Sequence, residues 1–469
     1  MNRRLLRPGS IAPHNAAFSR VADCLVDRWT SHFPTGTPIP NLEKELYRWA
    51  IESLGVMVFG GQLSFLESGG GTGSEGTHKS SKKEGAVGRE DNMEEFITAI
   101  HGIFKETSAM GTLPPAIVKA LKLPVWGRFT ESVNRALQLG QELVEAGVRT
   151  RLKAGQQESP TTPPPTLLDH LLTSDQLDTD TIVRLLTDLF LAAADTTSHT
   201  AIWSLYLLGR HPTEAQRARQ EILQVTRGRV EVEAEHLPSL PYLKAVVKEA
   251  LRLYPVAPFQ TRALHHDTML AGHLVPAGTM AVMSMFTTGR DPTLFPDPHR
   301  FSPDRWLRDI EPQQPSINTN SSISSSSSSS PSVCPSSSSN YSLCSSSPTF
   351  GPSSPSFPSS NPSFSSSNVS FSSSSSSSFS CPVSSSTTNH NNRLHSHAFI
   401  PFGVGVRSCI GRRVAETQLH LLLAKLVART DLRATNQVDM VMRMVGVTSH
   451  PVQLCLHPLQ TTTTTKTKT

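Results

Sequence analysis

The fold of this chain is decided by one stretch, Phe402-Gly403-Val404-Gly405-Val406-Arg407-Ser408-Cys409-Ile410-Gly411. It places a cysteine in a glycine-rich turn, with an arginine two positions before it and an amphipathic run after it. Glycine lets the backbone turn tightly and approach a flat ligand closely. The N–H groups that open a helix after the turn can point at the sulfur and stabilise its charge. The stretch therefore predicts a thiolate ligand in a turn that leads into a helix.

A thiolate held in this way can ligate haem iron, where it favours cleavage of an oxygen–oxygen bond. The guanidinium of Arg407 can pair with a haem propionate. The alternative is that Cys409 is a small apolar core residue in a turn. The stretch matches every fixed position of F-x-x-G-x-R-x-C-x-G and resembles the haem-binding signature of the cytochrome P-450 family. This resemblance implies that Cys409 is the axial ligand of haem b (iron protoporphyrin IX), and that Phe402, Gly403 and Arg407 contact the cofactor.

The composition sets wide limits on the protein class. The chain has 469 residues, enough for one large domain or several small ones. Charged residues make up 17% and hydrophobic residues 37%. Both values are low for a globular protein because a long serine tract dilutes them. The formal net charge of +5 does not argue for nucleic-acid binding and is compatible with an acidic protein partner.

The cysteines and the first residues bear on the cellular compartment of the protein and on where its domain begins. The six cysteines are Cys24, Cys334, Cys344, Cys381, Cys409 and Cys455. None forms a C-x-x-C pair, so neither a disulfide framework nor a zinc site is indicated, and a reducing compartment is favoured. We find no signal peptide and no run long enough to span a membrane. The first residues are basic with no apolar run behind them, so we expect a chain that begins partway through its domain.

Hydrophobic periodicity predicts a mainly helical protein with a small β region. Asp178 or Asp180 can cap the start of a long helix, and Gly209 with Pro212 ends it. Its centre is apolar over much of its surface, so it should run through the core. Short β-rich runs with glycine and proline punctuation occupy residues 255–285. The predicted helices span residues 16–28, 41–59, 93–110, 126–155, 179–209, 212–227, 241–253 and 409–430.

Residues 310–396 are dominated by serine, proline and asparagine. Such a segment cannot bury enough apolar surface to offset its ordering entropy, so we predict a disordered insertion. Residues 67–92 are predicted to form a mobile surface loop, and residues 459–469 a disordered tail. The cytochrome P-450 resemblance covers residues 1–309, where the N-terminal helices of the domain lack counterparts, and residues 397–458, which hold the haem-binding part.

A second motif, Ala192-Ala193-Ala194-Asp195-Thr196-Thr197, falls in the middle of the long helix. Small residues let a planar ligand approach, and a threonine hydroxyl can compete for backbone carbonyls and open a groove that holds water. The motif resembles the family's A-G-x-D-T-T, with Ala193 in place of the glycine. That resemblance implies that Asp195 and Thr196 are catalytic residues that deliver protons. The alternative is a capping or turn role.

Glu249 and Arg252 lie three residues apart, on one face of a predicted helix. Alone, this spacing most often marks a solvated surface pair. The resemblance implies that Glu249, Arg252 and Arg300 form a buried network that supports folding and haem retention. It also implies that Arg262 binds a second propionate.

Basic residues flank both motifs. Lys244 and Lys248 lie four apart on the helix that carries Glu249, and Arg412 with Arg413 follows the cysteine. In the mitochondrial branch of the family, which this arrangement resembles, such residues dock an acidic, adrenodoxin-like ferredoxin served by an NADPH-dependent reductase, and complementary charge suits that contact. The alternative is an ordinary solvated face. We find no flavin or nicotinamide fingerprint, so the reductase is expected on another chain.

Several stretches are similar to arthropod enzymes that hydroxylate carbon 2 of ecdysteroids: residues 251–259, 289–292, 407–414, 418–421 and 438–445. The resemblance implies a monooxygenase that uses O2 to hydroxylate a steroid such as 2-deoxyecdysone, peripheral on the matrix side of the mitochondrial inner membrane. Alternatives are another mitochondrial sterol hydroxylase, of the side-chain or vitamin D type, or a non-catalytic haem-binding or inactive fragment. The implied substrate wall, for which plain core packing is the other interpretation, comprises Ala192, Ala193, Val256, Ala257, Phe259, Val445 and Val447.

Overall fold

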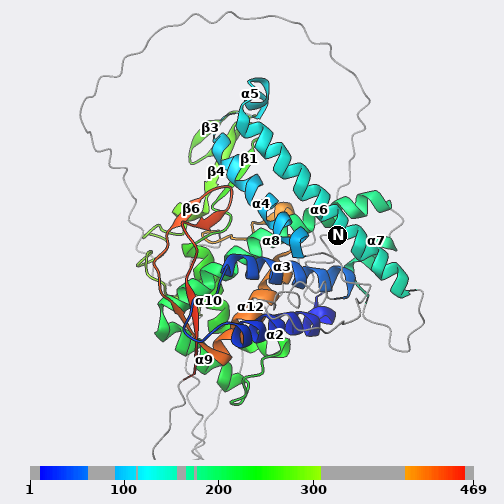
Figure 1. The fold of residues 1–469 in the computed structure, drawn as a ribbon. Coiled ribbons are helices and arrows are strands. Elements are labelled where there is room, and N and C mark those ends of the chain that lie inside the picture. Colours follow the sequence, from blue (N-terminus) through cyan, green and yellow to red (C-terminus); the bar gives the residue numbers. More distant parts are fainter. Residues whose placement is uncertain are drawn as a thin grey trace, which may run out of the picture. The chain divides into compact units, whose positions relative to one another are not determined.

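The computed structural model describes residues 11–61, 90–111, 113, 115–155, 165–173, 177–307 and 397–459, which belong to one compact unit. This part of the chain is mainly helical (Figure 1). Its helices are η1 (Ala12–His14), α2 (Asn15–His32), α3 (Leu42–Phe59), α4 (Glu90–Met110), α5 (Pro115–Ala120), α6 (Pro124–Gly155), α7 (Leu167–Leu172), α8 (Thr179–Arg210), α9 (Pro212–Val225), η2 (Ala234–Ser239), α10 (Pro241–Leu253), α11 (Met285–Thr288), η3 (Pro303–Trp306), η4 (Gly405–Arg407) and α12 (Arg412–Arg429).

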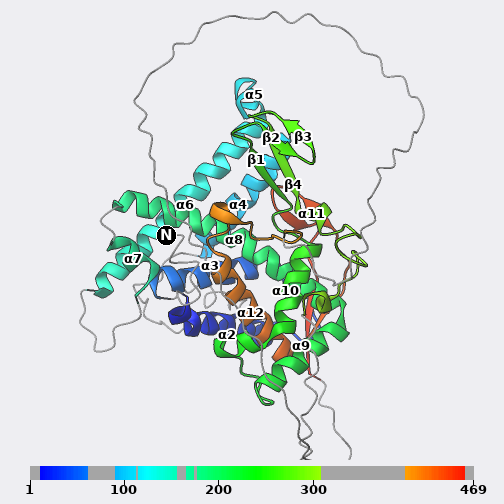
Figure 2. The ribbon, with the colours of Figure 1, turned by 180° about the vertical axis from the view of Figure 1, so that it is seen from behind.

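Helix α8 is the central helix and carries the Asp195–Thr196 motif. The Asp178 side chain accepts a hydrogen bond of 2.9 Å from the Thr181 N–H, which caps the helix start. Pro212 cannot continue the helix and opens α9 instead. From Ala201 to Gly209 every side chain of α8 is buried. Helices α3, α6, α10 and α12 all pack against α8, so its motif is held from several sides (Figure 2).

The strands form four two-stranded antiparallel sheets within the described residues. β1 pairs with β4 with Phe259 opposite Ser284, and β5 pairs with β8 with Leu432 opposite Leu456. Two tight hairpins, β2–β3 and β6–β7, complete the set. The strand bounds are β1 (Phe259–Ala263), β2 (Thr268–Leu270), β3 (His273–Val275), β4 (Met280–Ser284), β5 (Thr430–Ala434), β6 (Met440–Met442), β7 (Gly446–Thr448) and β8 (Leu454–Pro458).

The predicted fold class and helix positions are confirmed, because the eight predicted helices coincide with α2, α3, α4, α6, α8, α9, α10 and α12 to within a few residues. The strands β5 to β8 are additional; each is only three to five residues long, too short for a clear alternation. The predicted insertion at 310–396 lies outside the described residues, as do nearly all of the predicted loop and tail. No helix among the described residues has the length and apolar character needed to cross a membrane.

Candidate functional site

The loop before α12 folds back on itself and presents Cys409. Gly403 and Gly405 have φ angles of 67° and 66°, a left-handed conformation that favours glycine. The Cys409 N–H donates to the Phe402 carbonyl at 2.8 Å, and the Ser408 N–H donates to the Gly405 carbonyl at 3.1 Å. The glycine spacing of the sequence thus closes the turn that the motif predicts.

The Cys409 thiol lies just before the start of α12. The backbone N–H groups of Gly411 and Arg412 face the sulfur and lower its pKa, but burial outweighs them, so the pKa of the thiol is raised overall. Cys409 nevertheless keeps exposed surface and helps to line a cavity. The raised pKa favours the thiol form of Cys409, and the residue is exposed at this cavity.

We call this space the thiol cavity; its volume is about 480 Å³, within the usual range of cofactor and ligand pockets. Its walls come from α3, α8, β1 and the loop before α12, and they are mostly apolar. The predicted residues that line it are Ala192, Ala193, Thr196, Val256, Ala257, Phe259, Arg262, Phe402, Gly403, Arg407 and Cys409. One space therefore unites the predicted cysteine, both predicted propionate-binding arginines and five of the seven predicted substrate-wall residues.

The residues present fit a haem. The sulfur of Cys409 offers one soft axial ligand, and the apolar walls suit a flat macrocycle. Arg262 and Arg407 both line the cavity, and neither pairs with a carboxylate among the residues that the structure describes. Two guanidinium groups without such partners, beside a thiol, match a cofactor that carries two carboxylates.

Asp195 and Thr196 are neighbours on α8 but face different spaces. Thr196 is exposed to the thiol cavity, and its hydroxyl donates to the Ala192 carbonyl at 2.9 Å. Asp195 is 1% exposed and does not line the thiol cavity. Its Oδ1 accepts a hydrogen bond from Tyr47 of α3, and the Nδ1 of His199 lies 3.5 Å from the same oxygen. Consecutive residues of a helix point about 100° apart, which accounts for the split.

Glu249, which is fully buried, lies at the centre of a hydrogen-bonded network. Arg252 donates to both of its carboxylate oxygens, at 2.8 and 2.9 Å. The Trp306 indole N–H and the Ser302 backbone N–H donate to the same carboxylate, at 2.8 and 3.0 Å. The third charged member is Arg305, whose Nε donates to Glu249 at 2.9 Å.

The predicted place of Arg300 in this network is therefore wrong for its side chain. Arg300 is exposed and contributes only its backbone carbonyl, which accepts from Arg252 at 3.0 Å. The reason is the chain path: the backbone runs past Arg252 at residue 300 and then turns into η3, which directs Arg305 and Trp306 inward.

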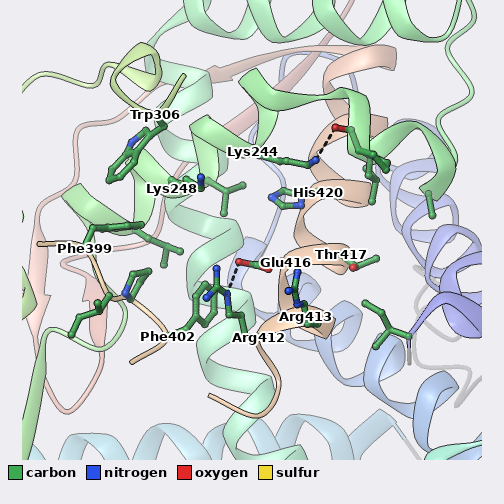
Figure 3. A pocket seen from close by; sticks show the side chains of 18 of the residues that line it. Lys244, Lys248, Trp306, Phe399, Phe402, Arg412, Arg413, Glu416, Thr417 and His420 are labelled. Atoms are coloured by element: carbon green, nitrogen blue, oxygen red, sulfur yellow. Dashed lines mark hydrogen bonds and ion pairs between the residues drawn. The ribbon is translucent and has the colours of Figure 1, made fainter. Parts of the chain in front are cut away.

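The four predicted redox-partner residues gather around a second space, which we call the basic pocket (Figure 3). It has a volume of about 680 Å³, and Lys244, Lys248, Arg412 and Arg413 all line it. Arg412 pairs with Glu416 at 2.9 Å. His420 lies behind the lysines, and its burial together with their charges lowers its pKa to about 3. The pocket therefore presents a positive surface, to which His420 adds no charge near neutral pH.

Val445 and Val447, the other two predicted substrate-wall residues, do not line the thiol cavity. The hairpin β6–β7 is fixed through Gly446, whose N–H donates to the Val256 carbonyl at 2.9 Å and whose carbonyl accepts from the Trp203 indole at 3.1 Å. This anchoring turns the flanking valines toward a third space, which also contains Asp195 and His199.

Three further side chains surround Asp195 and were not predicted from sequence: Tyr47 and His199 contact it, and Glu43 contacts His199. A signal for His199 was present, because a polar residue four positions after Asp195 on an apolar helix shares its face. Tyr47 and Glu43 lie on α3, about 150 residues away in sequence, and no local pattern links them to Asp195.

Comparisons with known proteins agree with this geometry. The family model for cytochrome P450 matches residues 1–324 and 385–456. Mitochondrial cytochrome P450 315a1 of Drosophila melanogaster is 28% identical over 422 residues, which cover 90% of this chain and 58% of that protein. Mitochondrial sterol 26-hydroxylase of Oryctolagus cuniculus is 27% identical over 98% of this chain and 69% of its own length.

A third relative is mitochondrial 25-hydroxyvitamin D-1 alpha hydroxylase of Mus musculus, 27% identical over 91% of this chain and 66% of its own length. The chain thus spans about three-fifths to two-thirds of the length of these relatives. With a family match over most of the sequence and a cysteine presented at a cavity that fits a haem, the chain belongs to the cytochrome P450 family.

Proposed function

We propose that this chain is a haem-thiolate monooxygenase that hydroxylates a steroid. The observation that carries the proposal is the exposure of the Cys409 sulfur to an apolar cavity that Arg262 and Arg407 also line. Haem b bound there would supply the activation of O2 and the transfer of one oxygen atom to a C–H bond. Cys409 would ligate the iron, and the two guanidinium groups would hold the propionates.

The remaining tasks belong to side chains of the cavity wall. Ala192 and Ala193 leave room beside α8 for a flat ligand, and Val256, Ala257 and Phe259 offer apolar surface that would orient a steroid. The Thr196 hydroxyl, fixed by its bond to Ala192, would hold a proton at the cavity wall. Asp195, buried behind Thr196, would exchange protons with it.

For the substrate, we propose 2-hydroxylation of an ecdysteroid such as 2-deoxyecdysone. The support is the set of stretches that resemble the arthropod 2-hydroxylase called Shadow, of which residues 251–259 and 407–414 include cavity-lining positions. A second candidate is another mitochondrial sterol hydroxylase, which the sterol 26-hydroxylase and vitamin D hydroxylase relatives favour.

The electron donor would be an adrenodoxin-like ferredoxin with its NADPH-dependent reductase. The basic pocket in Figure 3 supports this, because it gathers Lys244, Lys248, Arg412 and Arg413 on the face next to the Cys409 loop. The mitochondrial names of the relatives support a place in that organelle. Exposed apolar side chains just after α5 and on β2–β3, such as Leu121, Met269 and Leu274, are compatible with peripheral attachment to the inner membrane.

Two measurements test the proposal in sequence. A carbon monoxide difference spectrum of the reduced protein should give a thiolate-type Soret band; absence of haem uptake would instead favour an inactive fragment. The haem-loaded protein is then supplied with ferredoxin, its reductase and NADPH, and offered 2-deoxyecdysone and side-chain sterols in parallel. Oxidation of a side-chain sterol while 2-deoxyecdysone stays untouched would refute the ecdysteroid assignment.

A further inference from the structure

A third space, which we call the polar cavity, lies against α8 on the face that carries Asp195. Its volume is about 550 Å³, and its lining includes Asp195 and His199 of α8 together with Glu43 of α3. Thr196, the next residue of the motif, lines the thiol cavity instead. Asp195 and Thr196, which are consecutive on α8, therefore line two separate spaces: Asp195 the polar cavity and Thr196 the apolar thiol cavity.

Three side chains form a continuous path from the polar cavity to Asp195. The Glu43 carboxylate is 41% exposed, and its Oε1 lies 3.4 Å from the Nε2 of His199. The imidazole of His199 is only 1% exposed; its Nδ1 donates to the Asp195 carbonyl at 3.0 Å and lies 3.5 Å from Asp195 Oδ1. A small rotation of the ring moves the Nδ1 proton from the backbone acceptor to the carboxylate.

The carboxylate of Asp195 is held but not saturated. Tyr47 donates to Oδ1, and its ring packs edge-on against His199 with centroids 5.9 Å apart. The second oxygen, Oδ2, is buried and has no hydrogen-bond partner among the residues that the structure describes. A buried carboxylate oxygen without a hydrogen-bond partner costs free energy of folding, and a catalytic role is one explanation for its presence. It can accept a proton and pass it on.

We propose that His199, held in place by Glu43, feeds protons from the polar cavity to Asp195, and that Asp195 delivers them across α8 to Thr196. This inference rests on the proposed monooxygenase function and names a route for it. In each cycle the ring of His199, protonated on both nitrogens, gives its Nδ1 proton to Asp195 and then rotates so that Nδ1 regains a proton from solvent in the polar cavity. One proton enters for each that leaves, and no electron or other reactant is needed. His199 and Glu43 are thus positioning residues that act through Asp195.

The charges around His199 suit this role. Burial lowers the pKa of its imidazole, but hydrogen bonds and charges from the Glu43 and Asp195 carboxylates outweigh burial and raise it overall, which favours the protonated ring. Partial desolvation raises the pKa of Glu43, but hydrogen bonds and charges from His101 and His199 outweigh it and keep the pKa low. The other titratable groups that line the polar cavity are His101, Lys105 and Glu106 of α4, Arg128 and Glu131 of α6, and Arg443 and His450 of the C-terminal segment. Tyr47 of α3 is buried and faces Asp195.

The first test reads the protonation of His199 without turnover. The measurement is an NMR titration of the haem-loaded, reduced carbon monoxide complex with 13Cε1-labelled histidine. The His199 signal is assigned by its loss in His199→Gln. Glu43→Gln should move its titration to lower pH, because the variant removes a carboxylate that stabilises the imidazolium. His450→Gln, on the same cavity but without contact to Glu43 or Asp195, should leave it unchanged. An unmoved His199 titration in Glu43→Gln would refute the proposal.

The second test follows proton use under turnover. His199→Gln should lower product formation by at least about tenfold and divert reducing equivalents to peroxide, with little change in KM. The descending limb of the pH–rate profile should shift to lower pH in Glu43→Gln. A His199→Gln protein with normal haem spectrum, product yield and pH profile would overturn the route. If the wild type binds haem but oxidises no steroid, the proposed function fails while the His199–Glu43 titration result still stands on its own.

Discussion

The Nε of Arg305 lies 2.9 Å from Glu249 Oε1, the oxygen that also receives a 2.8 Å hydrogen bond from Arg252. One carboxylate, fully buried, therefore joins α10 to η3 and pairs with two guanidinium groups. A buried charge is tolerated when hydrogen bonds replace its lost water, and here five donors do so. Trp306 of this network also packs its ring against that of Phe399, with centroids 4.4 Å apart, so the network supports the chain just before the Cys409 loop.

Glu249→Gln should destabilise the protein by about 3–5 kcal/mol, since it leaves two guanidinium groups buried without their anion. Arg305→Gln should cost about 1–3 kcal/mol, because Arg252 still pairs with the carboxylate. Arg300→Gln is the matched control and should stay within about 0.5 kcal/mol of the wild type, since only its backbone joins the network. Urea unfolding of the haem-loaded variants measures these differences. Equal losses for Arg300→Gln and Arg305→Gln would contradict the network as drawn.

Features that depend on residues close together in the sequence could be predicted, whereas features that depend on tertiary contacts could not. The Cys409 turn and the start of α8 were predictable, because glycines at fixed spacing and an Asp178 cap act within a few residues. The exchange of Arg300 for Arg305 was not, because five residues of chain path decide which guanidinium turns inward. The same holds for Val445, whose direction is set by the contact of Gly446 with Val256. Local turns and helix caps can be read from neighbouring residues, whereas the placement of these side chains depends on tertiary packing.

Cys409→Ser should abolish the thiolate-type carbon monoxide spectrum, because an alcohol oxygen does not replace the soft sulfur ligand. The fold itself should survive, since Cys409 is exposed to the thiol cavity rather than packed in the core. Cys455→Ala is a matched control: this buried cysteine of β8 lies outside the cavity lining, and its loss should leave the spectrum unchanged. A thiolate-type band that persists in Cys409→Ser would exclude Cys409 as the ligand.

Lys248→Glu should weaken the interaction with an acidic ferredoxin. Lys248 is exposed at the basic pocket, so reversal of its charge places a repulsive group where Lys244, Arg412 and Arg413 attract the partner. The apparent KM for ferredoxin should rise by roughly tenfold at low salt, and the difference should shrink as ionic strength increases. The control is Lys119→Glu, an equal charge reversal on α5, outside the basic pocket. A similar rise in both variants would mean that only net charge matters.

His420 should make the protein sensitive to mild acid. Its folded pKa is about 3, whereas an ordinary histidine titrates near about 6.5, so between these values the unfolded chain binds a proton that the folded chain rejects. Stability should therefore fall as pH decreases through this window, by up to about 1.4 kcal/mol per pH unit, and the contribution should be constant above it. The cause is structural: burial comes first, and Lys244 and Lys248 add positive charge beside the ring.

His420→Gln removes this titration while keeping a polar side chain of similar size. Its stability should decline less steeply than that of the wild type between about pH 6.5 and pH 5, above the range where most carboxylates titrate. The difference between the two unfolding free energies, measured by urea denaturation at each pH, isolates His420 from the other histidines. Because Lys248 contributes to the shift, Lys248→Glu should raise the folded pKa and narrow the pH window at its acid end. Parallel curves for the wild type and His420→Gln would show that this imidazole takes up its proton in the folded protein as readily as in the unfolded chain.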